Sequence, residues 1–191
     1  MAETVATTER LVLRTWDPAD LDRFIEATNT PAVMRWLGGV WPREEHEAGF
    51  ERIQSYQSDF GHTLWLVEDR HSGEILGFCG LKRVNSPGAG DLTGTPEVGW
   101  RLRESAWGKG IAKEAAIASL DLNFGRFGYS EVVAITVEGN GASQGLMRRL
   151  GMQRRVDLDY IDPRHVDELG AALVWSMSAA DWPKARAAAL A

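Results

Sequence analysis

The sequence predicts a single α+β domain of interspersed strands and helices, and three observations support this fold class. A strand, Pro96–Leu102, runs into a turn with two glycines that opens directly into a helix. Apolar residues recur at helical spacing along that helix, at Ile111, Ala115, Ala118 and Leu122. The run at 132–137 is almost wholly apolar, which is typical of a central strand buried on both faces. We see no repeat, linker or change of composition that would divide residues 1–191 into domains, and we expect only 1–8 and 185–191 to be loose tails.

The first half of the chain predicts one strand, a helical region and a hairpin. Residues 10–14 alternate apolar and charged side chains, as a half-buried strand does. Asp17 and Pro18 are typical of a helix start, and later proline and glycine residues interrupt the helical pattern. The elements that follow are short helical pieces broken by Pro31 and Gly38-Gly39, a helix at 43–58, and strands at 64–68 and 74–82 joined by a turn at 69–73.

The second half begins with a loop at 85–96 that is rich in glycine and proline. The helix after the glycine turn is expected to continue to about Phe127. Asn140 is a good N-cap for a short helix, and Gly151 stands where such a helix ends. The remaining expected elements are strands at 152–160 and 169–177, and a fraying helix at 179–191.

Composition excludes several classes of function. The chain carries a net charge of −6 and has no block of basic residues, which argues against nucleic acid as the main partner. The N-terminus lacks a signal pattern and no apolar stretch reaches 18 residues, so we expect a cytoplasmic protein that does not contact membranes.

Cysteine and histidine usage gives no sign of a metal site. The single cysteine, Cys79, excludes an internal disulfide framework, and its apolar surroundings indicate a buried small side chain. His46, His62, His71 and His165 are scattered without close pairing, so structural or surface roles are favoured over metal ligation.

The glycine turn before the long helix predicts an anion site. A helix start leaves several backbone N–H groups unpaired and carries about half a positive charge. Gly108 and Gly110 lack the Cβ atoms that would hold an anion away from those donors. This geometry favours a phosphate or a pyrophosphate.

Four segments resemble the GNAT superfamily of acetyl-CoA-dependent N-acetyltransferases, and in particular its RimJ/RimL-like branch. They span nearly the whole chain, and each occupies the place that the family's pattern gives it. The segments are 8–14 with Asp20-Leu21, the strand at 75–81, the motif from Glu97 to Ala112, and Asn140, Ser143 and 150–152. Trp107 stands where the superfamily usually has Gln or Arg, but aromatic residues are common there in the RimJ/RimL-like branch.

The resemblance implies a fold, a co-substrate and a set of binding residues. The implied GNAT fold has a central, mixed but mostly antiparallel seven-stranded sheet, flanked by helices, whose fourth and fifth strands splay apart to admit pantetheine. Acetyl-CoA is the implied co-substrate, with no metal. The implied acetyl-CoA-binding residues are Trp100, Leu102, Trp107, Gly108, Lys109, Gly110, Ile111, Ala112, Asn140 and Ser143.

Two residues are candidates for catalysis. Ser143 would donate a proton or hydrogen bond to the leaving thiolate, although it could instead only assist the helix start. Glu97 would act as a base, directly or through water, although it could equally be a solvated carboxylate at a strand end. Trp36 and Trp41 flank the glycine pair where the family forms one wall of the acceptor groove, although they could equally be ordinary core anchors. The loop at 159–165 is expected to form the opposite wall.

The absence of an evident strong base favours an acceptor amine of low pKa. An α-amine with a pKa near 8 is roughly a tenth neutral at pH 7, whereas lysine is neutral in about one molecule per few thousand, a gap of roughly 3 kcal/mol. A protein or peptide N-terminus is therefore the expected acceptor. An antibiotic amine, a polyamine or an amino acid remains open, as do a longer acyl donor, an acyl-CoA-binding sensor on the same fold, and a homodimer.

Overall fold

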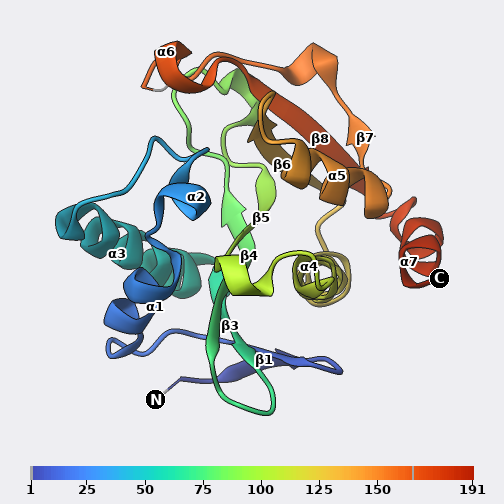
Figure 1. The fold of residues 1–191 in the computed structure, drawn as a ribbon. Coiled ribbons are helices and arrows are strands. Elements are labelled where there is room, and N and C mark those ends of the chain that lie inside the picture. The colour runs from blue at the N-terminus through green and yellow to red at the C-terminus, as the bar shows by residue number, and fades with distance from the viewer. Residues whose placement is uncertain (1, 165) are drawn as a thin grey trace. The chain divides into compact units, whose positions relative to one another are not determined.

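The computed structural model describes residues 2–164 and 166–191, which fold into a mixed α+β structure (Figure 1). His165 therefore lies outside the described residues. The chain divides into two compact units, the first made of Met1–Lys82 and Gly99–Ser119 and the second of Arg83–Val98 and Leu120–Ala191. Within the described residues, eight strands are hydrogen-bonded in the order β1-β2-β3-β4-β5-β6-β8-β7.

The first unit begins with four antiparallel strands, β1 (Thr4–Thr7), β2 (Leu11–Arg14), β3 (Leu64–Asp69) and β4 (Ile75–Arg83). Between β2 and β3 lie the helices α1 (Asp20–Thr28), α2 (Pro31–Met34) and α3 (Arg43–Phe60), and α1 packs against α3 (Figure 1). The unit also contains the end of β5 (Pro96–Leu102), the 3₁₀ turn Glu104–Ala106 and most of α4 (Ile111–Asp121). A core cluster of apolar side chains from α1, β3 and β4 consists of Phe24, Leu66, Ile75 and Phe78, with Trp16 and Leu64 packed against it.

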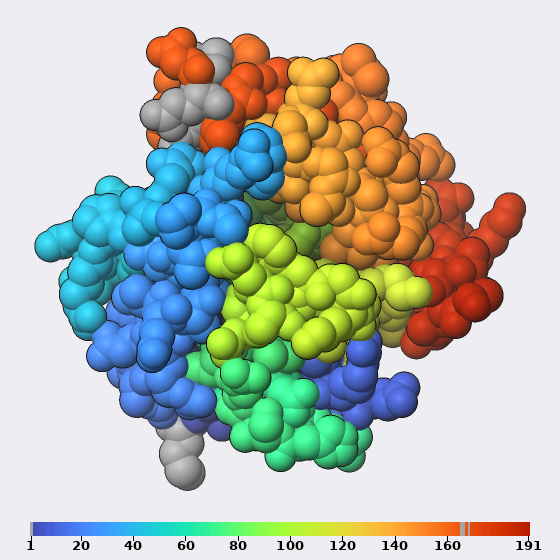
Figure 2. Space-filling view, in the orientation of Figure 1, coloured from blue at the N-terminus to red at the C-terminus, as the bar shows by residue number. Residues whose placement is uncertain are grey.

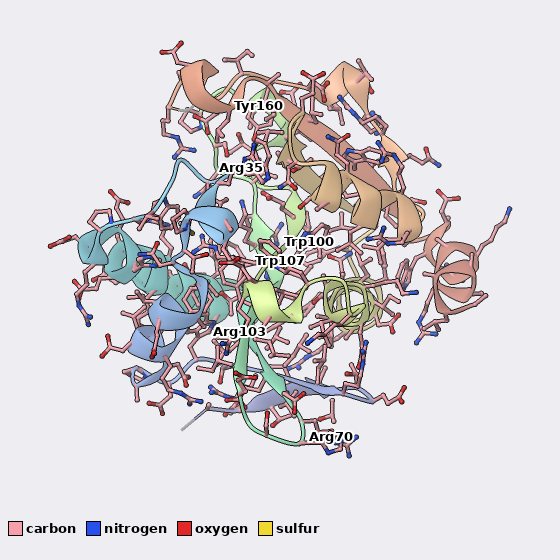
Figure 3. All side chains as sticks on the ribbon, in the orientation of Figure 1. Arg35, Arg70, Trp100, Arg103, Trp107 and Tyr160 are labelled. Atoms are coloured by element: carbon pink, nitrogen blue, oxygen red, sulfur yellow. The ribbon has the colours of Figure 1, made fainter. Side chains whose placement is uncertain are left out.

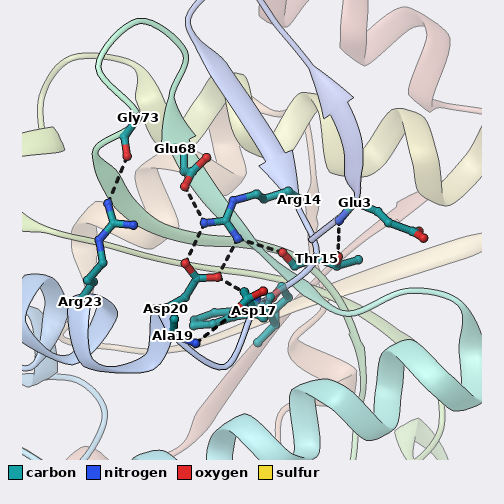
Figure 4. Close-up of polar contacts among 11 residues, drawn as sticks. Glu3, Arg14, Thr15, Asp17, Ala19, Asp20, Arg23, Glu68 and Gly73 are labelled. Carbon is teal, nitrogen blue, oxygen red and sulfur yellow. Dashed lines mark hydrogen bonds and ion pairs between the residues drawn. The ribbon is translucent and has the colours of Figure 1, made fainter. Parts of the chain in front are cut away.

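An ion-pair cluster fixes the start of α1 to this sheet (Figure 4). The Arg14 guanidinium on β2 binds both carboxylate oxygens of Asp20, at 2.7 and 2.8 Å, and Glu68 on β3 at 2.5 Å. The Asp20 carboxylate also accepts the Asp17 N–H at 2.7 Å. Burial raises the pKa of Asp20, but these hydrogen bonds outweigh it and hold the pKa below its ordinary value. The helix that the sequence predicts from Asp17 and Pro18 therefore begins at Asp20.

Gly77 allows β4 and β5 to approach closely within the first unit. Its φ of +142° is a conformation that L side chains rarely adopt, and a Cβ there would lie 2.0 Å from the Arg101 carbonyl oxygen. Only glycine fits this position, which sets the path of the strand that carries Trp100 to Leu102.

The second unit is built on β6 (Glu131–Val137), β7 (Gln153–Arg154) and β8 (Ala172–Ser178), with β8 antiparallel to both of the others. The start of β5 pairs in parallel with β6, and Glu97 lies opposite Val133. The helix α5 (Gly141–Arg149) packs on β6, and α6 (Val166–Leu169) and α7 (Trp182–Leu190) complete the unit (Figure 1). Its shorter turns are the 3₁₀ turns Gly90–Leu92 and Val156–Leu158 and the π-helical turn Leu122–Arg126, which extends α4 as expected. The separation of β5 from β6 beyond Glu97 stays a prediction.

Both expected tails are instead ordered elements. Residues 1–8 contain β1, an edge strand that pairs with β2 and raises the strand count from the predicted seven to eight. At the C-terminus, α7 continues to Leu190, with Trp182 and Ala189 buried and Asp121 accepting hydrogen bonds from both Trp182 and Arg186. Each correction depends on a partner that is distant in the sequence, which local patterns do not reveal.

The strand predicted at 152–160 is also largely wrong. Only β7 is extended, and it is followed by a 3₁₀ turn and a single bridge between Tyr160 and Ala172. The cause is Arg154, whose guanidinium pairs with Asp159 and donates to the Val174 carbonyl at 3.1 Å. This interaction folds the segment back on itself, so it cannot continue as a strand.

Candidate active site

The glycine turn that precedes α4 is an open, positively polarised helix start. Gly108 and Gly110 have φ values of +72° and +78°, which residues with a Cβ rarely adopt. No heavy atom lies within 4 Å of the place where a Gly108 Cβ would be. The ladder of α4 begins with the Glu114 N–H, which donates to the Gly110 carbonyl at 3.0 Å. The N–H groups before Glu114 lie in the first turn of the helix, where the backbone offers them no intrahelical acceptor. The glycine turn lies at the surface (lime green in Figure 2).

A clamp from the N-terminal region holds this turn in place. The Glu114 carboxylate accepts from the Thr8 hydroxyl at 2.5 Å, the Arg10 N–H at 2.9 Å and the Arg10 Nε at 2.7 Å. Arg10 Nη1 also donates to the Lys109 carbonyl at 2.8 Å. Burial raises the pKa of Glu114, but the hydrogen bonds from Thr8 and Arg10 outweigh it and lower the pKa below its ordinary value. No local sequence pattern predicts this clamp, because its members lie about a hundred residues apart.

We expect Glu114→Gln to destabilise the fold at pH 7 by about 1–3 kcal/mol, because it removes the charge that Arg10 and Thr8 solvate. Since folding lowers the pKa of Glu114, its contribution is present above the unfolded-state value near 4.3 and is lost as the pH falls through the folded-state value. Urea unfolding of wild type and variant at pH 7 and pH 4 measures the difference, which should shrink at pH 4. Glu51→Gln, on an exposed position of α3, is the control. A difference that is equal at both pH values would contradict this account.

The predicted residues on β5 and the loop after it lie in contact. Trp107 is 48% exposed, and its indole Nε1 donates to the Leu102 carbonyl at 2.9 Å (Figure 3). Leu102 itself is buried, whereas Trp100 is half-buried. One lone pair of the Leu102 carbonyl is thus already used by this chain. Arg103, which follows β5, pairs with Glu74 at 2.5 Å.

Trp36 and Trp41, predicted to line the acceptor groove, are both half-buried. The Arg35 guanidinium lies 4.7 Å from the centroid of the Trp36 ring. The Trp41 backbone is fixed by two hydrogen bonds with the Asn29 side chain, and its indole Nε1 donates to the Leu37 carbonyl at 3.0 Å. The Trp41 ring is therefore held rigidly at the start of α3.

Behind Trp41 lies a feature that the sequence analysis missed, a buried arginine on β5. The Arg101 guanidinium is 4.8 Å from the Trp41 ring, 5.1 Å from Phe78 and 5.8 Å from Phe24. His46 of α3 packs beside it, with its ring 5.5 Å from that of Trp41. The signal that could have found Arg101 is a charged residue between the apolar residues Trp100 and Leu102 near the end of the strand.

In the second unit, Asn140 and Ser143 lie together at the start of α5, as predicted. Asn140 is the N-cap, and its Oδ1 accepts the Ser143 backbone N–H at 3.1 Å. This bond uses the main chain of Ser143 and not its hydroxyl. Ser143 is half-buried at the third helical position, where the helix dipole favours negative charge.

Glu97 is also in the second unit, near the start of β5, and only 6% of it is exposed. A solvated carboxylate at a strand end would be far more exposed, so burial argues against that alternative. The loop at 159–164 borders a cavity of about 220 Å³ lined by residues of 88–92 and 157–160. Two carboxylates there are already engaged, because Asp157 pairs with Arg155 and Asp159 with Arg154.

The remaining candidates are structural. Cys79 is fully buried, and burial raises its pKa to about 12, so the thiol stays protonated at neutral pH. His62 is buried, with Nδ1 3.2 Å from the Leu81 carbonyl, and His71 lies in the exposed hairpin turn. Within residues 2–164 and 166–191, no three His, Cys, Asp or Glu side chains are placed to share a metal ion. The helices of this same part of the chain are too short or too polar to cross a bilayer.

The fold and the glycine turn before α4 define a GNAT acetyltransferase, and comparison with known proteins agrees. Residues 10–153 match the family described as Acetyltransferase (GNAT) domain, so the chain belongs to this family. It is 30% identical to YkkB of Bacillus subtilis (strain 168), over 79% of this chain and 86% of that protein. It is 25% identical to N-acetyltransferase p20 of Bacillus licheniformis, over 77% and 81%.

Solved structures show the same fold. An acetyltransferase from Agrobacterium tumefaciens str. C58 aligns with a TM-score of 0.74 at 25% identity, over 90% of this chain and 92% of that one. RimL, a ribosomal L7/L12 alpha-N-protein acetyltransferase, aligns with a TM-score of 0.70 at 16% identity, over 93% and 95%. This second likeness shows the fold alone. The protein is an acetyl-CoA-dependent N-acetyltransferase, and membership of the RimJ/RimL-like branch stays a prediction.

Proposed function

We propose that this protein transfers an acetyl group from acetyl-CoA to an α-amine of low pKa, most favourably a protein or peptide N-terminus. The observation that carries the donor side is the open helix start at Gly108 and Gly110, fixed by Arg10 and Glu114. Its geometry fits a pyrophosphate, because a Cβ at Gly108 would project into open space where an anion could approach the N–H groups.

The predicted donor residues have distinct tasks in this proposal. The N–H groups from Gly108 to Ala112 hold the pyrophosphate, and the exposed Lys109 adds positive charge. Main-chain groups of Trp100 and Leu102 pair with the pantetheine arm by strand addition. Trp107 covers the loop, and its bond to the Leu102 carbonyl fixes the register between loop and strand. Asn140 shapes the start of α5 around Ser143.

The chemistry needs a neutral amine, a polarised carbonyl and a stabilised leaving group. Acetyl-CoA, when bound, supplies an activated acetyl group. The Ser143 hydroxyl donates to the departing sulfur, aided by the positive end of α5. Glu97, directly or through water, accepts the proton that the amine nitrogen loses as its new bond forms. Direct attack is favoured over a covalent enzyme intermediate, because the Cys79 thiol is buried and protonated.

The acceptor preference follows from the absence of an evident strong base. A single carboxylate can assist an amine that is already partly neutral, but it cannot offset the roughly 3 kcal/mol by which lysine is harder to deprotonate than an α-amine. RimL, which shares this fold at 16% identity, is an N-terminal acetyltransferase, so the fold is compatible with an acceptor of this kind.

Thiol release from acetyl-CoA with a panel of amines tests the proposal. We expect N-terminal peptides to react faster at pH 7 than lysine peptides, polyamines or aminoglycosides, and the lysine rates to rise steeply toward pH 10 as that amine loses its proton. Wild type without acceptor is the control for hydrolysis. Faster reaction of lysine peptides at neutral pH would overturn the preference, and CoA binding without thiol release from any amine would favour an acyl-CoA sensor.

A small-molecule acceptor is the second candidate. The buried Arg101 and His46 beside Trp41 favour it, because a fixed positive charge next to a histidine suits a compact ligand with a negative group. The same panel extended with free amino acids distinguishes the two candidates. A homodimer and a longer acyl donor are further possibilities for this family, and sedimentation and a series of acyl-CoA donors test them.

A further inference from the structure

The Arg101 guanidinium is a buried charge without a counterion. Only 9% of Arg101 is exposed, and no carboxylate pairs with it among the residues that the structure describes. Its Nε is buried and has no hydrogen-bond partner. Burial lowers its pKa to about 10, so the group still carries its charge at neutral pH. An unpaired buried charge costs several kcal/mol, which a chain rarely bears without use.

The three aromatic rings explain only part of this arrangement. Trp41, Phe78 and Phe24 lie within 6 Å of the guanidinium, at 4.8, 5.1 and 5.8 Å, close enough for cation–π attraction. Such contacts stabilise the cation, but a ring accepts the in-plane N–H groups of a guanidinium poorly. The buried Nε–H of Arg101 therefore still requires an acceptor.

A second unsatisfied polar group lies at the same place. His46 is 4% exposed, and its Nε2 is buried without a partner. Burial and the nearby charge of Arg101 lower the pKa of His46, so its ring is neutral at pH 7. A neutral imidazole carries one N–H donor. Both side chains pack against the Trp41 ring, and the site thus offers one fixed charge with donors from two elements.

We propose that Arg101 and His46 bind a carboxylate of the acceptor, with Trp41 forming the outer wall of the site. This inference rests on the proposed acetyltransferase function and specifies its acceptor. Phe24 and Phe78 are buried, whereas Trp41 is half-buried, so the approach from solvent runs along Trp41. Trp41 is also the residue that the sequence places in the acceptor groove.

The chemistry of the site favours a carboxylate over other anions. A guanidinium presents paired N–H donors that match the two oxygens of a carboxylate. A single positive charge beside a neutral histidine balances one negative charge, whereas a phosphate dianion would stay half compensated. The carboxylate has two sources, an acidic side chain near a protein N-terminus or the α-carboxylate of a free amino acid.

Matched acceptor pairs test the proposal. One arm compares peptides that differ only in an N-terminal Asp or Asn, and the other compares leucine with leucinamide, with rates corrected for the neutral fraction of each amine. We expect wild type to favour the carboxylate member in at least one arm by about tenfold to a hundredfold in kcat/KM. A preference in the first arm alone identifies a protein acceptor, and one in the second alone identifies a free amino acid.

Variants assign the preference to Arg101. Arg101→Gln should raise the KM for the acceptor that carries the carboxylate until the two acceptors of a pair have nearly equal kcat/KM. The KM for acetyl-CoA should stay unchanged. Arg101→Lys should restore part of the preference, because it keeps the charge but not the paired donors. Arg52→Gln, on the exposed side of α3, is the matched control. No preference in either arm with wild type, or a preference that survives Arg101→Gln, would overturn the proposal.

A binding measurement keeps the test independent of folding and of turnover. Calorimetric titration of CoA-loaded wild type with N-acetylaspartate and N-acetylasparagine, and with N-acetylleucine and its amide, needs no variant. Tighter binding of the carboxylate member in either pair supports the site, and equal binding in both pairs overturns it. If no amine is acetylated at all, the proposed function is wrong, but this titration still shows whether the protein binds a carboxylate more tightly than its amide.

Discussion

Replacing both glycines before α4, Gly108→Leu with Gly110→Leu, is expected to weaken CoA binding by about a hundredfold or more. The leucine side chains would cover the N–H groups of the helix start and exclude the pyrophosphate, which removes several charge-assisted hydrogen bonds at once. Calorimetry with CoA measures the affinity, and steady-state kinetics should show a matching rise in the KM for acetyl-CoA.

The control for this variant must reproduce its backbone strain. Gly108 and Gly110 have positive φ values, so any side chain costs about 1–2 kcal/mol at each position regardless of ligand. Gly73 and Gly128 have φ values of +69° and +66°, and neither has a heavy atom within 4 Å of a built Cβ. Gly73→Leu with Gly128→Leu should therefore lose similar stability and keep CoA affinity. If the first pair also kept its affinity, the donor would not be held at this turn.

Ser143→Ala is expected to lower kcat by about a hundredfold while the KM for acetyl-CoA changes little. Without the hydroxyl, the departing thiolate loses the group that stabilises it, and acid assistance of this kind contributes roughly 10²–10⁴-fold. The loss should be smaller for acyl donors with a more acidic thiol, which leave without help. Initial rates of thiol release at saturating acetyl-CoA and acceptor measure kcat.

The structure separates this role from a role in the helix start. The cap of α5 uses the Ser143 backbone N–H and the Asn140 side chain, and alanine retains that bond. Thermal unfolding of Ser143→Ala then measures what the hydroxyl adds to stability beyond this cap, separately from the loss of kcat. Ser130→Ala, at an exposed position of the same unit, should match wild type in both assays. A kcat within about twofold of wild type would leave Ser143 with the structural role alone.

Most of the fold could be predicted because its signals are local. The glycine turn and the start of α4, the Asn140 cap and the hairpin between β3 and β4 each depend on residues close together in the sequence. The features that escaped prediction depend on distant partners. β1 is a strand only because β2 pairs with it, and α7 is ordered only because Asp121 and the core of its unit bind it.

The candidate site divides in the same way. Gly108 and Gly110 were predicted from what an anion site at a helix start requires, and Asn140 and Ser143 from the family resemblance. The clamp of Glu114 and the surroundings of Arg101 were not predicted, because each joins residues from several elements.

The sequence by itself determined the family, the order of most elements and the place of the glycine turn before α4, since each rests on patterns among near neighbours in the chain. Only the tertiary structure decided that Arg101 is buried beside Trp41 and His46, with no carboxylate paired to it among the described residues. The physical reason is that the cost of a charge depends on what surrounds it in space, and a linear sequence does not specify those surroundings.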